Sequence, residues 1–376
     1  MDKKLNIVAI NIPWPANYGG VIDIYCKIKA LHDCGVKVIL HCFEYGRPHA
    51  AELEDVCEEV YYYRRRTGLL SNLTYLPYNV YSRKNKRLIA NLLKNDYPVL
   101  FEGLHTCYYL NDRRLENRFK IFRECNIEHD YYRAIGKAER NLLKKCFFHI
   151  EAIRFKWYQK NVAKAELMIA VSGTDTDYLK QEFPRNKVEF MPSFHGNDRV
   201  MSTAGQSGFL LYHGNLSVME NEKAALYLIE NVFGKMTSYR CIIAGLDPSE
   251  TLKKAVSRHG NITLVANPSS EYMHELIRTA QVNLLVTFQD TGLKHKLLNS
   301  LFTGRHVVVN PMMLTGSGLN ELCHIAGTPE EMIEICSKLM NTPFSADIPE
   351  ERRKKLFPFF SDNCQARKLI EMIRFQ

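Results

Sequence analysis

The feature that most constrains the fold of this sequence is a regular alternation of short apolar runs with helical segments. The runs LNIVAINI (5–12), VKVILHCF (36–43) and ELMIAVS (166–172) are largely apolar, which is typical of strands buried on both faces of a sheet. Helical stretches separate them, and the first of these, 21–35, closes at a glycine. The pattern predicts a doubly wound parallel sheet with helices on both faces.

The alternation occurs twice. A polar stretch, 194–208, interrupts it, and a second series begins with FLLYHG (209–214) and continues through YRCIIAG, ITLVAN, VNLLVTF and HVVVNP. A chain of 376 residues is long enough for two domains with separate cores. We therefore expect two Rossmann-like α/β domains, 1–192 and 193–356, facing each other across a cleft at the carboxyl ends of their strands, where such folds bind ligands.

One stretch of the first domain, 137–165, predicts one or two long helices. Phe147, Ile150, Ile153 and Trp157 recur there at helical spacing. Apolar residues at this spacing usually face the core, so we expect these four side chains to be buried.

Cysteine usage and hydropathy indicate the compartment. Eleven cysteines are scattered without a CxxC pair, which predicts reduced thiols in a cytoplasmic protein. No stretch reaches the about 18 apolar residues of a membrane-spanning helix. The start of the chain, 1–15, has the basic and apolar parts of a signal peptide, but its apolar run is too short and fits a first core strand better.

The net charge of +9 is unevenly distributed, because the segment 61–94 contains no acidic residue. Its cations are Arg64, Arg65, Arg66, Arg83, Lys84, Lys86, Arg87 and Lys94, interleaved with Tyr61, Tyr62, Tyr63, Tyr75, Tyr78 and Tyr81. A solvated basic face is one interpretation. The other is contact with an anionic membrane surface, where each cation contributes about 1 kcal/mol. The segment lacks the motifs of nucleic-acid-binding modules, so we expect no nucleic-acid partner.

Asp175-Thr176-Asp177 is a literal DxD sequence, a pattern that binds metal ions in some enzymes. Its context predicts a helix start instead. Ser172 stands at the expected N-cap with Asp175 three residues later, which is a variant of the capping box. Acidic residues are also favoured by the dipole in a helix's first turn. We therefore expect no metal here.

Polar residues at the ends of predicted strands are the candidate ligand contacts. In the first domain, Gly19 and Gly20 open the first helix, where they either let backbone approach a ligand or only form a tight turn. The group Glu128, His129 and Asp130 follows the strand near 119–125, and we expect it to face the cleft.

The second domain has two such places. His213, Gly214 and Asn215 follow its first strand, where they either contact a ligand or cap the next helix. Lys294 and Lys296 stand behind Gly292 at a predicted helix start. Cations are disfavoured at the electropositive N-terminus of a helix unless an anion is present. A phosphate fits, because each charge-assisted hydrogen bond contributes about 1.5–3 kcal/mol.

The run TGLKHKLLNSLFTGRHVVVN (291–310) resembles a segment of the retaining glycosyltransferase family 4, which has the two-domain GT-B fold. The family's pattern is G-x-K-x-K-L-L-E-A-x-x-x-G-x-P-V-V. The matching residues are Gly292, Lys294, Lys296, Leu297, Leu298, Gly304, Val307 and Val308. The segment YHGNLSVMENEKAALYLIENVF (212–233) is similar to the first strand and helix of that family's nucleotide-binding domain. The resemblance spans nearly the full chain and implies that the terminal helix, 357–376, crosses back to the first domain.

The resemblance also implies roles for individual residues. Lys294 and Lys296 would hold the diphosphate of a nucleotide-sugar donor, and His129 would lie beside the donor sugar at the reaction centre. Further donor contacts would come from Gly19, Gly20, Ala266, Asn267, Pro268, Gly316, Ser317, Gly318 and Leu319, largely through backbone. Thr291 and Asn299 stand where the family commonly has glutamates, and Asn215 stands where it often has an arginine. Asn299 can still hydrogen-bond a ribose hydroxyl.

The implied activity is a metal-independent, retaining transfer of a sugar from a nucleotide diphosphate to an acceptor hydroxyl, without a cofactor. We expect a saccharide or lipid-linked acceptor in cell-surface polysaccharide or glycolipid synthesis. The segment 61–94 would place the protein at the inner face of a membrane. Two alternatives remain: a catalytically inactive nucleotide-sugar-binding module, which Thr291 and Asn299 suggest, and a nucleotide-sugar epimerase.

Overall fold

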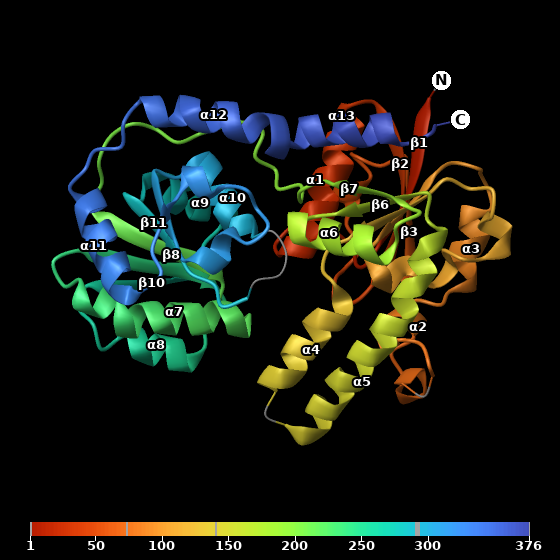
Figure 1. Cartoon of the computed structure of the whole chain (residues 1–376), viewed down its shortest axis with the longest axis horizontal. Helices are drawn as coiled ribbons and strands as arrows, with labels where there is room; N and C mark the ends of the chain where they lie inside the picture. The colour runs from red at the N-terminus through yellow and green to blue at the C-terminus, as the bar shows by residue number, and fades with distance from the viewer. Residues whose placement is uncertain (1, 73, 140, 290–293, 376) are drawn as a thin grey trace. The chain divides into compact units, whose positions relative to one another are not determined.

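The computed structural model describes residues 2–72, 74–139, 141–289 and 294–375 (Figure 1). The chain forms two compact units. Unit 1 contains 1–196 and 362–376, and unit 2 contains 197–361. The sequence placed these boundaries at 192/193 and 356/357.

Unit 1 is built on a seven-stranded parallel sheet in the order β3-β2-β1-β4-β5-β6-β7. Its strands are β1 (Lys3–Ala9), β2 (Val36–Glu44), β3 (Glu59–Arg64), β4 (Val99–Glu102), β5 (Lys120–Glu124), β6 (Leu167–Ala170) and β7 (Lys187–Phe190). Its helices are α1 (Gly19–Asp33), α2 (Tyr78–Tyr81), α3 (Lys86–Leu92), α4 (Glu128–Ala138), α5 (Leu142–Tyr158), α6 (Gly173–Glu182) and α13 (Asp362–Met372).

Unit 2 is built on a six-stranded parallel sheet in the order β10-β9-β8-β11-β12-β13. Its strands are β8 (Phe209–Asn215), β9 (Arg240–Leu246), β10 (Ile262–Ala266), β11 (Val282–Leu285), β12 (His306–Val309) and β13 (His324–Ile325). Its helices are α7 (Met219–Asn231), α8 (Glu250–Val256), α9 (Ser270–Thr279), α10 (His295–Thr303), α11 (Pro329–Met340) and α12 (Asp347–Phe360).

Alternate residues of each central strand enter separate hydrophobic cores, which explains why the strand sequences are apolar throughout. In β5, Phe122 packs into one core of unit 1 and Ile121 into the other. Helix α13 packs against α1, and its Leu369 joins the same core as Ile24 of α1. The two doubly wound parallel sheets and the return of the C-terminal helix to the first unit are therefore confirmed.

Each sheet reverses its strand order once, between β1 and β4 in unit 1 and between β8 and β11 in unit 2. Ligands of doubly wound folds bind outside the carboxyl ends of the strands at such a reversal, because the two adjoining loops diverge there. These edges are where the candidate sites belong.

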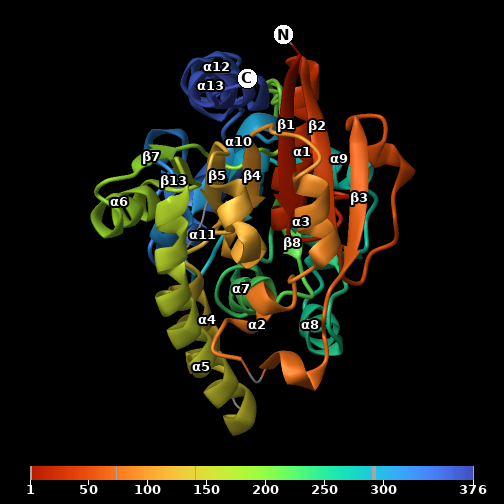
Figure 2. The same cartoon turned by 90° about the vertical axis from the view of Figure 1, so that its right-hand side faces the viewer.

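Helices α4 and α5 pack side by side as a hairpin that projects beyond the sheet of unit 1 (Figures 1 and 2). The prediction that α5 buries its apolar stripe is wrong, since the exposed fractions of Ile150, Ile153 and Trp157 are 49%, 61% and 69%. The opposite face of α5 is the buried one, through Ala152 and Phe155. None of the described helices has the length and apolarity needed to cross a membrane.

Candidate functional site

The start of α10 carries the two predicted lysines. Lys294 is the N-cap residue, with extended backbone, and Lys296 lies in the first turn. The ammonium of Lys296 donates to Asn221 Oδ1 at 2.8 Å and lies 5.1 Å from the centre of the Tyr212 ring. Burial lowers the pKa of Lys296 to about 8, against the raising effect of Glu220. The charged form of Lys296 is therefore destabilised by burial at an electropositive helix end. A bound anion would stabilise it.

His213, near the end of β8, lies behind this lysine. Its Nε2 is 3.0 Å from the hydroxyl oxygen of Ser300 on α10, and the side chain is buried. Burial, together with the charge of Lys296, lowers the pKa of His213 to about 3. The imidazole is therefore neutral at physiological pH and joins β8 to α10 rather than acting as a cation.

Gly214 and Asn215 are the last residues of β8, and Asn215 helps to position Asn221. Asn215 Oδ1 accepts from the amide of Ser217 at 3.1 Å, and the Asn215 carbonyl accepts from Asn221 Nδ2 at 2.9 Å. Gly214 lies opposite Gly245 of β9, where a Cβ on Gly245 would stand 1.9 Å from the Gly214 carbonyl oxygen, so the close approach of the two strands requires glycine at 245. The Asn215 side chain therefore bonds to its own loop, and Asn221 contacts Lys296.

Glu220 is a site residue that the sequence did not single out. Its Oε1 accepts from the hydroxyl of Thr287 and, at 3.3 Å, from the amide of Phe288, both just after β11. Asn310, after β12, holds Thr287 by accepting from its amide at 3.1 Å. The only signal in the sequence was the position of Glu220 in the segment that resembles the family's second-domain helix.

The predicted base-contacting segment follows β10. Asn267 has a left-handed backbone with φ of 51°, and neighbouring Asp247, after β9, has φ of 47°. Asn267 Oδ1 accepts from the Asp247 amide at 2.8 Å, which couples the two strained residues. Ala266 is exposed and Pro268 is half-buried. Strained backbone of this kind is common at ligand sites, where contacts from the surrounding structure hold it in place.

The loop that contains Gly316, Ser317, Gly318 and Leu319 was predicted to offer its amides to a diphosphate. Gly316 and Gly318 adopt φ of 70° and 68°, a conformation that disfavours side chains other than glycine. The amide of Ser317 donates to Leu314 at 3.0 Å, and that of Leu319 donates to the Ser317 hydroxyl at 3.2 Å. Two of the four predicted donors therefore stabilise the loop itself.

Asn299 lies on α10, where its Oδ1 accepts from Asn197 Nδ2 at 2.7 Å. Thr291 and Gly292 lie outside the described residues. Of the three positions that distinguish this chain from the family, the structure thus describes Asn215 and Asn299, and both side chains already have partners.

At the carboxyl edge of unit 1, Gly19 and Gly20 are the first residues of α1. A Cβ on Gly20 would make ordinary contacts, 3.5 Å from Ile10 and 3.6 Å from Tyr18. This helix start therefore tolerates a side chain at Gly20, and sterics alone do not require glycine there.

His129 and Glu128 begin α4 and are both buried, whereas the side chain of Asp130 is 47% exposed and pairs with Arg133 at 2.5 Å. His129 Nδ1 has no hydrogen-bond partner among the described residues, and its ring centre lies 5.8 Å from that of Tyr178. Burial lowers the pKa of His129, against the raising effect of Asp130. A neutral, incompletely bonded imidazole at a strand end is a candidate for contact with a substrate.

Glu124, the last residue of β5, was not predicted. It is fully buried, and its carboxylate has no side-chain hydrogen-bond partner among the described residues. Burial, with the nearby charges of Glu128 and Asp175, raises its pKa well above the ordinary value. The DxD residues begin α6, where the Ser172 hydroxyl accepts from the Asp175 amide at 3.0 Å, so their interpretation as a helix start is confirmed.

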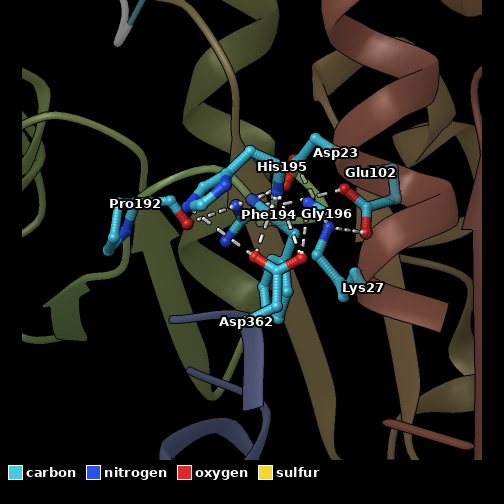
Figure 3. A network of polar contacts seen from close by, with 9 residues as sticks. Asp23, Lys27, Glu102, Pro192, Phe194, His195, Gly196 and Asp362 are labelled. Carbon is cyan, nitrogen blue, oxygen red and sulfur yellow. Dashed lines mark hydrogen bonds and ion pairs between the residues drawn. The ribbon is translucent and has the colours of Figure 1, made fainter. Parts of the chain in front are cut away.

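Behind these groups lies a buried ion network (Figure 3). Lys27 Nζ is 2.6 Å from Glu102 Oε1, and Arg123 Nη2 is 3.0 Å from Asp23 Oδ1. Burial alone would raise the pKa of Asp23, but Arg123 and Lys27 outweigh it and hold that pKa well below its usual range. Asp23 also accepts from the amide of Phe194 at 2.7 Å.

Asp362 fixes the two chain segments at the limits of unit 1. As the first residue of α13, it accepts from the amides of His195 at 3.0 Å and Gly196 at 2.8 Å (Figure 3). The segment that leaves unit 1 and the helix that re-enters it are therefore held together.

One group of described residues, Asp23, Glu102 and Cys125, has ligand atoms close enough to hold a metal ion. Both carboxylates already pair with Lys27 and Arg123. A divalent cation would add to this buried positive charge without an excess of negative charge to balance it, so the group does not fit a metal site.

The segment 61–94 is less solvated than its sequence suggests. Arg83 is buried and donates to the carbonyls of Asn79 at 2.7 Å and Ile10 at 2.8 Å. Arg65 donates to Asn79 Oδ1 at 2.8 Å, whereas the side chain of Arg64 is 94% exposed. Part of the basic segment therefore holds unit 1 together.

A cavity of about 730 Å³ opens in unit 1 beside α3, within the size range of small-molecule sites. Its lining combines aromatic rings, amides and cations, among them Tyr75, Lys84, Tyr108, Tyr158 and Asn161. Lys84 Nζ lies 5.5 Å from the centre of the Tyr108 ring.

Comparisons with known proteins agree with this fold. No family model matches the sequence. A Klebsiella pneumoniae protein described as an uncharacterized 44.6 kDa protein in the cps region is 25% identical over 393 residues, which cover 98% of each chain.

Three solved structures are similar to the whole chain. HepE of Anabaena, in complex with UDP and glucose, has a TM-score of 0.63 at 11% identity, with 98% of both chains covered. A TarM mutant of S. aureus, in a complex that includes UDP, has a TM-score of 0.68 at 10% identity, with 98% and 99% covered. A glycosyltransferase of Rickettsia africae has a TM-score of 0.66 at 13% identity, with 99% and 97% covered. The chain therefore has the GT-B fold of these glycosyltransferases.

Proposed function

We propose that this protein transfers a sugar from a nucleotide diphosphate donor to an acceptor hydroxyl. The observation that carries the proposal is the pair Lys294 and Lys296 at the start of α10, beside the order reversal of the sheet in unit 2. Among the described residues, the hydrogen-bond partners of Lys296 are two neutral groups, Asn221 and Tyr212, and the charge of Glu220 acts on it without a direct contact. A diphosphate would add charge-assisted hydrogen bonds to this lysine.

In the proposed reaction, negative charge develops on the departing diphosphate. The bond between the sugar's anomeric carbon and the diphosphate breaks, and the acceptor oxygen forms a bond to that carbon. The two lysines and the α10 dipole stabilise the departing diphosphate, which takes the acceptor's proton. No protein nucleophile, metal or cofactor is needed for this balance. The resemblance of the sequence to family 4 adds retention of configuration to the proposal, with His129 beside the donor sugar.

The similar structures support UDP as the first nucleotide to test, because HepE and TarM were both solved with it. The cps-region relative supports a saccharide acceptor in cell-surface polysaccharide synthesis by a cytoplasmic protein. In unit 1, the cavity with Tyr75, Tyr108 and Asn161 offers rings for stacking on sugars and an amide for their hydroxyls. More specifically, we propose that the acceptor is lipid-linked and that the segment 61–94 contacts the anionic membrane that carries it.

The test is UDP binding by isothermal titration calorimetry. Lys294→Ala/Lys296→Ala should weaken UDP binding by about tenfold or more, since one charge-assisted hydrogen bond contributes about 1.5–3 kcal/mol. The matched control is Lys253→Ala/Lys254→Ala on α8 of the same unit, where Lys253 pairs with Glu250 at 2.7 Å. Full UDP affinity in the first variant would show that the site is wrongly assigned.

Turnover then separates the alternatives. Release of UDP from a UDP-sugar that depends on an added saccharide acceptor supports the transferase. Binding without release, under any acceptor, indicates the inactive module suggested by Thr291 and Asn299. Interconversion of donor sugars without acceptor indicates an epimerase.

A further inference from the structure

Helix α5 has an apolar face that the described residues of unit 1 leave exposed. Leu143, Cys146, Ile150, Ile153 and Trp157 are all exposed, with Leu143 at 83% and Trp157 at 69%. At about 100° per residue these positions fall within one narrow stripe, about 21 Å long. Helix α5, which carries these residues, runs from the tip of the α4–α5 hairpin towards the sheet of unit 1 (Figure 2).

The stripe is not the packing surface of α5. That surface lies on the other side of the helix, where Ala152 and Phe155 enter the core and Glu151 accepts from the amide of Tyr78 at 2.7 Å. The helix is therefore held by one face and presents a second apolar face outward. Exposed apolar surface of this extent marks an interaction site.

The charges around the stripe are almost all positive. Between 141 and 165 the chain has six cations, Lys144, Lys145, Arg154, Lys156, Lys160 and Lys164, and one acidic residue, Glu151. Glu151 is buried and pairs with Arg154 at 2.8 Å, and Lys156 pairs with Glu182 of α6 at 3.3 Å. The outer positive charge therefore comes from the other four lysines. Lys160 Nζ lies 5.0 Å from the centre of the Trp157 ring, at the end of the stripe.

We propose that the outer face of α5 binds an anionic lipid surface, with the apolar stripe in the interfacial region and the lysines at the headgroups. An aromatic and aliphatic face bordered by lysines is what an interfacial helix requires, since apolar burial and attraction to anionic lipid act together. Tryptophan is favoured at this depth, because its ring is both apolar and polar.

A second copy of the chain fits this face poorly. Two copies joined through the stripe would bring two sets of lysines together, and the one acidic residue of the segment is already buried and paired. An anionic membrane neutralises the same lysines. The inference stands apart from the proposed transferase activity, because it rests on the outer face of α5 and not on the lysines of α10.

The experiment is co-sedimentation with sucrose-loaded vesicles of phosphatidylcholine, with and without phosphatidylglycerol. The wild-type chain should bind only the vesicles with phosphatidylglycerol, and added salt should weaken binding. Ile153→Ser/Trp157→Ser and Lys144→Glu/Lys145→Glu should each reduce binding by about tenfold or more. Because these side chains are exposed or half-buried, the thermal unfolding midpoint should stay unchanged.

Each variant has a matched control in unit 2. Phe357→Ser/Phe359→Ser removes two aromatic side chains of α12 that are 41% and 63% exposed, and Lys253→Glu/Lys254→Glu reverses an adjacent lysine pair on α8. Both controls should bind like the wild-type chain. Arg64→Glu/Arg65→Glu/Arg66→Glu tests the segment 61–94 in the same assay.

Three results would overturn the inference. The first is a wild-type chain that does not bind vesicles with phosphatidylglycerol. The second is loss of binding in the Arg64–Arg66 variant alone, which would place the contact in 61–94. The third is a wild-type dimer in sedimentation velocity that Ile153→Ser/Trp157→Ser converts to a monomer, which would show that α5 binds a second copy.

Discussion

The carboxyl edges of the two sheets share a strand order and carry different ionisable groups. In unit 1, strands β4 and β5 end in the buried acids Glu102 and Glu124. In unit 2, the helix after β11 starts with Lys294 and Lys296. The same doubly wound fold thus presents buried acidic groups at one edge and cations at the other.

The difference also lies in how each charge is balanced. Glu102 pairs with Lys27 inside unit 1, and the raised pKa of Glu124 favours its neutral form. Among the residues that the structure describes, the hydrogen-bond partners of Lys296 are neutral side chains, and its pKa is about 8. The acids of unit 1 are therefore largely structural, whereas the cation of unit 2 is suited to a ligand. The loops and helix starts decide this, and the topology does not.

The largest expected effect comes from breaking the internal balance of unit 1. Arg123→Leu leaves Asp23 and Glu102 buried with one cation fewer, so the free energy of unfolding should fall by about 3–5 kcal/mol in urea denaturation. The control is Arg114→Leu, whose exposed partner pair with Asp112 spans 2.8 Å and should contribute about 0–1 kcal/mol. Equal losses in the two variants would show that the buried network is not the stronger contribution.

An intermediate effect is expected when pH changes the charge in unit 2. Because the pKa of Lys296 is about 8, UDP affinity should fall as pH rises above 8, by up to about tenfold per pH unit. Lys296→Arg keeps its charge, so its affinity should be independent of pH in this range. Titration calorimetry at several pH values checks this, and a flat wild-type profile would contradict it.

In the absence of ligand, the effect of Lys296 on stability changes with pH in the opposite direction to its effect on UDP affinity. The folded pKa of Lys296, about 8, lies below the ordinary 10.5, so the unfolded chain binds the proton more tightly. This lysine should therefore contribute stability that increases as pH rises from 8 towards 10.5.

The smallest expected effect concerns the buried acid Glu124. The pKa of Glu124 is raised in the folded chain, so the folded state binds its proton more tightly than the unfolded state. Its contribution to stability should fall as pH rises from the ordinary value of 4.5 to the raised pKa. Glu124→Gln should remove this slope in urea unfolding across that range, whereas Glu116→Gln, at an exposed residue of the same unit, should leave it unchanged.

Much of the fold was predictable because its signals are local. Apolar runs predicted buried parallel strands, and the Ser172 cap predicted the start of α6. The positions of Lys294 and Lys296 at a helix start followed from the same kind of local pattern. The fate of individual side chains was less predictable. The stripe of α5 was predicted to be buried because helical spacing shows that residues share a face, without showing whether that face has a partner.

The contacts of the candidate site could not be predicted from local sequence patterns either. Asn221, which aims Lys296, and Glu220, which bonds to Thr287, lie far from these partners in the chain and meet them only across the sheet. Arg83 looked like a surface cation until the fold placed it against Ile10.

The sequence by itself determined the alternation of strands and helices, the two sheets and the two lysines at the start of α10, because hydrophobic period and capping act within a few residues. The tertiary structure alone decided which charges are paired inside the protein. That pairing depends on burial and on partners from distant segments. Lys27 is balanced by Glu102, the hydrogen-bond partners of Lys296 among the described residues are neutral, and the apolar stripe of α5 is exposed.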